Sequence, residues 1–174
     1  MAPTTNKLIA EENCKWSAAS FRICGEILNL EEIEKTLGIK ATLSHLKGQG
    51  SRSNVVYRES LWSLKSLLNR SESLDKHLAW LLDRLESKVE EVRSLSRLHR
   101  LDFFCGFGSV NGQGGFILDS VMLARLAKFG ISLGIDLYPP LSMDENEDAT
   151  PLRVHDMKVR ITHAWFPNSP QSDR

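Results

Sequence analysis

Apolar and polar residues alternate along several short segments of the chain, a pattern typical of strands that bury one face. The clearest case covers residues 16–24. One side of this strand would carry Ala19, Phe21 and Ile23, and the other Trp16, Ser20 and Arg22. Five further strands are predicted, at residues 39–47, 55–65, 101–109, 115–118 and 131–138.

Between these strands, apolar residues recur every three or four positions, as in amphipathic helices. Residues 30–37 are predicted to be helical, with Asn29 as the N-cap and Gly38 as a left-handed C-cap. The longest pattern runs from Leu74 to Leu95 and predicts one long helix. A third helix is predicted to begin at Asp119 or Ser120.

The predicted order is βαββαβ followed by an additional βαβ, which indicates an α+β fold. The first six elements match the ferredoxin-like arrangement. We therefore expect a two-layer sandwich, with the helices on one face of a mainly antiparallel sheet and the other face open. In this arrangement the first strand is central and the fourth lies beside it, so that Arg22 and Asp102 could pair across the open face.

The domain organisation follows from the same pattern. Residues 1–15 are predicted to be a flexible N-terminus, residues 16–139 a single α+β domain, and residues 140–174 an acidic linker with a strand-like tail. Alternation over residues 157–165 predicts either an extra strand of the sheet or a strand available to a partner.

The composition excludes several classes of function. The chain has 22 basic and 22 acidic residues, so it lacks the positive charge of a nucleic-acid-binding or membrane-attracted protein. No segment has the apolar length of a signal peptide or a membrane span. Three cysteines without C-x-x-C spacing favour a reducing cytoplasm over a disulfide framework.

The charges are nevertheless unevenly distributed. Residues 40–70 contain six basic residues and only one acidic residue, Glu59, a local charge of +5, whereas residues 141–150 carry −4. The basic region could attract an acidic protein partner. Alternatively, these charges could simply keep a hairpin loop soluble and protect an edge strand.

No pattern of residues indicates catalysis. The glycine-rich run from Gly106 to Gly115 leads into a predicted strand, which favours a hairpin turn over a phosphate-binding loop. His155 and His163 lack a third ligand at metal spacing, so we expect no metal or other cofactor. Cys105 and His99 are a conceivable nucleophile and base, but strand alternation directs Cys105 toward the core.

Several runs, in order, resemble a known family: SFRICG (20–25), LGIKATLSHLKG (37–48), LWSL (61–64), FFCGF (103–107), NGQGGFIL (111–118) and GIDLYP (134–139). Over residues 16–139 the chain resembles the bacterial domain-of-unknown-function 4279 family. This resemblance implies a small cytoplasmic α+β domain and no particular reaction, because function cannot be taken from a fold.

We therefore expect a non-enzymatic protein-interaction domain, of the immunity or accessory type. It would bind an acidic partner, or a second copy as a homodimer, through the open sheet face or the basic region. The alternative is an anion-binding or small-molecule-binding domain, or a hydrolase, with a cleft near Arg22, His45, Lys47 and Asp136. The candidate binding residues are Trp16, Arg22, His45, Lys47, Trp62, Asp102 and Asp136.

Overall fold

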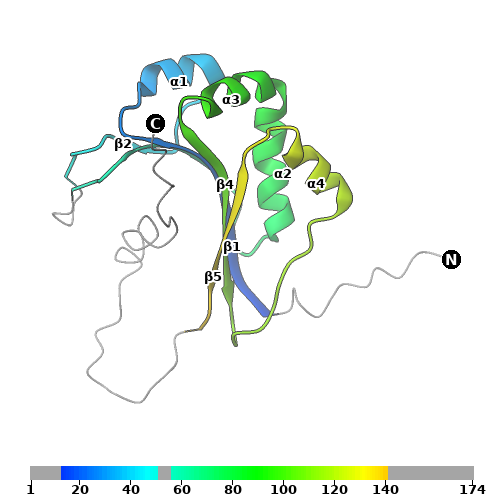
Figure 1. The fold of residues 1–174 in the computed structure, drawn as a ribbon. Coiled ribbons are helices and arrows are strands. Elements are labelled where there is room, and N and C mark those ends of the chain that lie inside the picture. The colour runs from blue at the N-terminus through cyan, green and yellow to red at the C-terminus, as the bar shows by residue number, and fades with distance from the viewer. Residues whose placement is uncertain (1–12, 51–55, 141–174) are drawn as a thin grey trace, which may run out of the picture. The chain divides into compact units, whose positions relative to one another are not determined.

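The computed structural model describes residues 13–50 and 56–140, which form one five-stranded sheet in the order β2-β3-β1-β4-β5 (Figure 1). Neighbouring strands are antiparallel except for β4 and β5, which are parallel. The predicted α+β class and the mainly antiparallel sheet are therefore confirmed. The strands are β1 (Cys14–Gly25), β2 (Leu43–His45), β3 (Ser60–Lys65), β4 (Arg100–Ser109) and β5 (Ser132–Tyr138).

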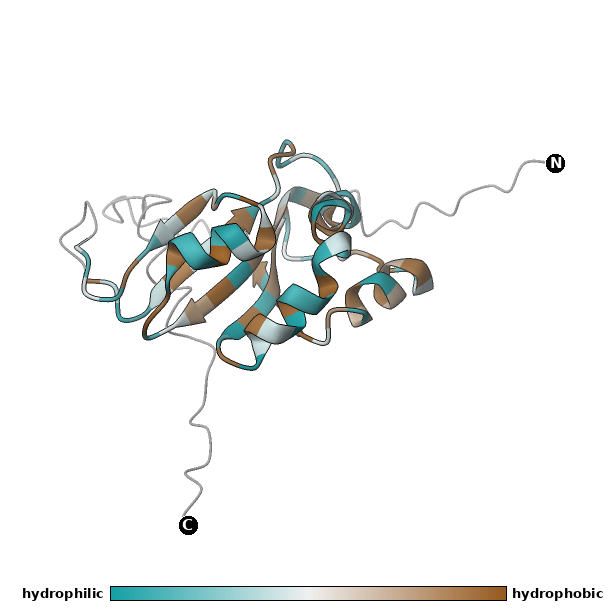
Figure 2. Ribbon diagram, turned by 90° about the horizontal axis from the view of Figure 1, so that it is seen from above, coloured by the Kyte–Doolittle hydropathy of each residue, from teal (hydrophilic) through white to brown (hydrophobic). Residues whose placement is uncertain are grey.

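The helices pack on one face of this sheet and make a second layer (Figure 1). They are α1 (Leu30–Leu37), α2 (Leu74–Leu85), the 3₁₀ turn η2 (Glu86–Lys88), α3 (Val89–Ser96) and α4 (Ser120–Ala127). Figure 2 shows hydrophilic and hydrophobic residues on these helices, as expected when only one side of each is buried. The core joins apolar residues of every α-helix to Ala19, Phe21 and Ile23 of β1.

The ends of two helices are capped as the sequence predicts. The side chain of Asn29 accepts a hydrogen bond from the backbone N–H of Glu32, and Gly38 adopts the left-handed conformation at φ +67°. At the start of α4, the Asp119 carboxylate accepts a hydrogen bond from the backbone N–H of Met122 (2.7 Å). These local signals therefore fix where α1 and α4 begin.

The prediction of one long helix from Leu74 to Leu95 is wrong. The turn η2 interrupts it and separates α2 from α3. Glu86, the first residue of η2, binds Arg125 of α4 at 3.0 Å. Leu85 and Val92, on either side of the break, are both fully buried. The interruption thus accompanies a contact with a distant helix, which the local spacing of apolar residues does not encode.

The predicted strand at 115–118 is also wrong. These residues form no strand, and Phe116 instead packs against Phe107 of β4, with ring centroids 5.9 Å apart. The free edge of β4 is taken by β5, which runs parallel to it. Parallel neighbours need a crossover rather than a tight hairpin, and α4 lies in that crossover. Residues 1–12 and the predicted strand at 157–165 lie outside the described residues.

Candidate binding face

The face of the sheet opposite the core is covered by no helix of the described part of the chain, and we call it the open face (Figure 1). Strand register sets which side chains share it, because alternate residues point to the same side. Across β1 and β4, Arg22 is opposite Asp102, Ser20 is opposite Phe104, and Trp16 is opposite Gly108. From β5, Asp136 and Tyr138 share this face through their register with Gly106 and Gly108.

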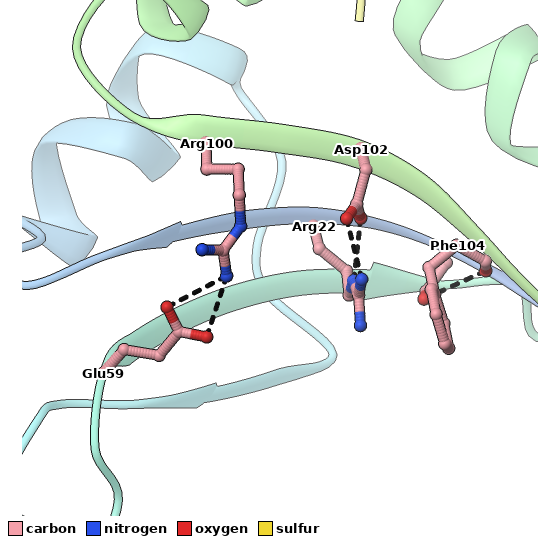
Figure 3. A network of polar contacts seen from close by, with 6 residues as sticks. Arg22, Glu59, Arg100, Asp102 and Phe104 are labelled. Carbon is pink, nitrogen blue, oxygen red and sulfur yellow. Dashed lines mark hydrogen bonds and ion pairs between the residues drawn. The ribbon is translucent and has the colours of Figure 1, made fainter. Parts of the chain in front are cut away.

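Arg22 and Asp102 form a bidentate ion pair on the open face (Figure 3). Nε and Nη2 of Arg22 each donate a hydrogen bond of 2.7 Å to a separate carboxylate oxygen of Asp102. The Arg22 guanidinium also lies 3.7 Å from the ring centroid of Phe104. The pairing predicted from strand alternation is confirmed. Because both carboxylate oxygens are occupied, the pair holds this part of the face in a fixed geometry.

A second ion pair links the first residue of β4 to the segment that precedes β3. Nη2 of Arg100 donates to both carboxylate oxygens of Glu59 at 2.9 Å (Figure 3). Cys24 lies nearby and is buried, and this burial raises the pKa of its thiol. The two carboxylates of this region, Asp102 and Glu59, therefore each have an arginine partner already.

Trp16 forms the centre of an aromatic cluster at the other end of the open face. Its ring lies over Gly106 and Gly108, where a Cβ would be 2.8 Å and 2.1 Å from atoms of the indole. The ring of Tyr138 packs beside it at 5.0 Å between centroids. The guanidinium of Arg70 lies over the indole, 4.0 Å from its centroid. We call Trp16, Arg70 and Tyr138 the Trp16 cluster.

Asp136 lies next to this cluster, on the same face of β5 as Tyr138. Burial, together with a hydrogen bond to Asp136, raises the pKa of Tyr138. Tyr138 therefore stays protonated at physiological pH and can donate to the carboxylate of Asp136. Tyr138 is neutral, so this contact gives the Asp136 side chain a donor without changing its charge. Arg70 is the exposed basic residue of the cluster.

His45 and Lys47 lie at the opposite edge of the sheet. The His45 ring stacks on Tyr57, with centroids 3.6 Å apart, and its burial lowers its pKa while the neighbouring Glu59 opposes this shift. Lys47 donates a hydrogen bond of 2.8 Å to the exposed carboxylate of Glu26. Both residues are thus engaged with neighbours of their own.

The seven candidate residues do not form one site. Trp62 is fully buried on the core side of β3, away from the open face. Using about 4.8 Å between strands and about 3.3 Å per residue, the register separates Arg22 from Asp136 by about 16 Å and from His45 by about 12 Å. The structure therefore places Trp16 and Asp136 in the same region of the open face and pairs Arg22 with Asp102. It does not bring Arg22, His45, Lys47 and Asp136 together.

Three further features of the described residues concern a nucleophilic cysteine, a metal site and a membrane-spanning helix. Cys105 is fully buried, as predicted, and burial raises the pKa of its thiol to about 12, which leaves almost no thiolate to act as a nucleophile. Within residues 13–50 and 56–140, no three His, Cys, Asp or Glu side chains are grouped to hold a metal ion. No helix in these ranges has the length and apolar character needed to cross a membrane.

Sequence reasoning missed Arg70 and the glycines beneath Trp16. Arg70 follows β3 in an irregular segment, where neither alternation nor helical spacing places a side chain. The glycines could have been recognised from the sequence, because a glycine inside a strand often marks the close approach of another group. Gly106 and Gly108 of β4 and Gly134 of β5 share the open side, and side chains from that side, Trp16 and Phe104, fill the space above them.

No curated protein and no solved structure matches the chain significantly. One family model matches residues 12–140, which includes every helix and strand described above. The chain therefore belongs to the family of the domain of unknown function DUF4279.

Proposed function

We propose that this protein is a non-enzymatic interaction domain that binds an acidic protein partner through the open face. The observation that carries the proposal is the Trp16 cluster, in which an exposed arginine lies stacked on an indole beside a tyrosine. Tryptophan, tyrosine and arginine are the residue types that most often supply the binding energy of protein interfaces. Stacking also restricts the Arg70 side chain, which reduces the entropy lost when a partner binds.

The charges near the Trp16 cluster favour an acidic partner. Arg22 and Arg100 are each occupied by a carboxylate, whereas Arg70 makes no ion pair with any described residue. A carboxylate from a partner would give the Arg70 guanidinium the bidentate contact that its planar geometry favours.

The test uses the photoreactive amino acid p-benzoylphenylalanine in place of Tyr138, a substitution that keeps an aromatic ring in the Trp16 cluster. The full chain would be crosslinked in the cells that naturally produce it. We expect a discrete adduct that is lost when Arg70→Glu is added. The captured protein, once purified, should bind the wild-type chain and bind the Arg70→Glu chain at least tenfold more weakly.

The chain contains a matched control. Arg84 is also an exposed arginine stacked on a tryptophan, 3.5 Å from the centroid of Trp80, but it lies on helix α2. Arg84→Glu should leave both the adduct and the affinity unchanged. Equal loss of binding with Arg84→Glu, or an adduct indifferent to Arg70→Glu, would contradict the proposal.

We also infer a finer classification of the fold and a cellular location. The order β4-β1-β3-β2 with antiparallel neighbours supports a ferredoxin-like arrangement of the first four strands, to which α4 and β5 are an addition. The buried thiols Cys24 and Cys105 support a reducing cytoplasm as the place where the protein acts.

A further inference from the structure

We infer that the acidic partner binds by adding an extended segment to the outer edge of β5, a mode of recognition that rests on the proposed function. Strand β5 is the last strand of the sheet, and no described strand pairs with its outer side. Alternate backbone N–H and C=O groups of an edge strand point away from the sheet and can pair with another chain.

The β5 edge lacks the features that usually protect an edge strand. Its seven residues contain no lysine, arginine or proline, and Pro139 and Pro140 follow only after it ends. Its single charged residue is Asp136, which lies on the open face. The other edge of the sheet, β2, is three residues long. Length and composition together make β5 the edge suited to receive another strand.

Both sides of β5 offer contacts to such a segment. On the core side of the sheet, Ile135 and Leu137 remain exposed, with 36% and 64% of their surfaces accessible. On the open face, Tyr138 adjoins Trp16, over which Arg70 is stacked. A bound strand would direct alternate side chains to these two sides.

This arrangement specifies the chemistry of the segment. Side chains directed to the core side would be apolar, since they would cover Ile135 and Leu137. A side chain directed to the open face near Tyr138 would be aspartate or glutamate, because Arg70 has no carboxylate partner among the described residues. The ligand is therefore an extended protein segment in which apolar residues alternate with at least one acidic residue.

A phage-displayed library of random heptapeptides, selected on the immobilised full chain, tests this inference. We expect enriched peptides with alternating apolar residues and at least one acidic residue. Their affinity should fall at least tenfold for Leu137→Lys, which places a charge on the edge, and the acidic preference should disappear for Arg70→Glu. Leu98→Lys is the matched control, because Leu98 is also exposed, at 78% against 64% for Leu137, but follows α3.

Three results would overturn the inference. The first is that no peptide is enriched above the bare support. The second is that enriched peptides bind Leu137→Lys as well as wild type. The third is that the backbone amides of β5 are as protected from hydrogen exchange as those of β4 in the protein alone, because the edge would then already be paired. Sedimentation velocity would show whether a second copy pairs with it.

The same variants separate this inference from the proposed function. If the adduct formed from position 138 is lost with Arg70→Glu and kept with Leu137→Lys, the open face binds the partner and strand addition is wrong. If Leu137→Lys abolishes binding while Arg70→Glu has no effect, strand addition stands and recognition of an acidic partner by the Trp16 cluster fails.

Discussion

The indole of Trp16 occupies the space that a side chain at Gly108 would need. A Cβ added at position 108 would lie 2.1 Å from Nε1 of Trp16, a distance that two such atoms cannot adopt. The residue lies within strand β4, opposite Trp16 in register, so it serves the close approach of a ring rather than a turn. The open face is therefore built around this contact.

The variant Gly108→Ala should displace the Trp16 ring and destabilise the protein by about 1 to 3 kcal/mol, the usual cost of overpacking. Urea unfolding would measure this loss, and a change in native tryptophan fluorescence would report the displacement. Gly50→Ala is the control, because a Cβ at position 50 meets nothing within 4 Å. Equal stability of the two variants would show that Trp16 does not pack on Gly108.

The ion pair between Arg22 and Asp102 should contribute more to stability than the pair between Arg100 and Glu59. The side chains of the first pair are 19% and 9% exposed, whereas those of the second are 42% and 29% exposed. Asp102→Ala would leave a largely buried guanidinium without its carboxylate and should cost about 2 to 3 kcal/mol. Glu59→Ala, in the better hydrated pair, should cost about 0.5 kcal/mol.

A double-mutant cycle with Arg22→Ala separates the ion pair from other effects of the substitution. The coupling energy between positions 22 and 102 should account for most of the loss in Asp102→Ala. A coupling energy near zero would mean that the side chains stabilise the sheet by packing alone, including the stacking of Arg22 on Phe104.

The pairing of β1 with β4 shows how far the sequence could be interpreted. Alternation along β1 identified the side that carries Arg22, and the element order placed β4 beside it, so the contact with Asp102 was predictable. The caps at Asn29 and Asp119 were also predictable, because each depends only on residues within one turn. Both kinds of information are local or follow from topology.

The features that the sequence did not predict depend on contacts between distant segments. Residues 115–118 are a short apolar run after a glycine-rich turn, as in the second strand of a hairpin, but β5 takes the edge that they would need. The break at Glu86 accompanies its binding to Arg125, 39 residues later. Arg70 reaches Trp16 from an irregular segment. In each case the competing partner lies far along the chain, where periodicity gives no information.

Stability should decrease as the pH falls below about 6.5, because burial lowers the pKa of both His77 and His45 in the folded state. Above pH 6.5 both imidazoles are neutral whether the chain is folded or not. Below it the unfolded chain takes up protons that the folded protein resists, so the free energy of unfolding falls by up to about 1.4 kcal/mol per pH unit for each histidine.

Urea unfolding between pH 7.5 and 5.0 would measure this dependence. His77→Gln should remove more of the slope than His45→Gln, since His77 is 1% exposed and His45 is only partly buried. The carboxylates with lowered pKa values, such as Glu86, act below pH 4.5 and stay outside this range. A slope that is unchanged in His77→Gln would contradict the assignment.

Thiol reactivity should distinguish the buried cysteines from Cys14. Burial raises the pKa of Cys105 to about 12, so at pH 7.5 almost none of this thiol is in the thiolate form that reacts with iodoacetamide. Cys24 is also buried, and its pKa is raised for the same reason. In the native protein, mass spectrometry of the alkylated peptides should therefore show rapid modification of Cys14 alone, because Cys14 is partly exposed.

Unfolding provides the control for this experiment, because in urea all three thiols should react at similar rates. Cys14→Ser should abolish the rapid phase of native alkylation and leave the slow reaction of the other two cysteines. Native modification of Cys105 at the rate of Cys14 would mean that this thiol is activated. The pair of Cys105 and His99 would then return as a nucleophile and base, and a non-enzymatic function would no longer be the better interpretation.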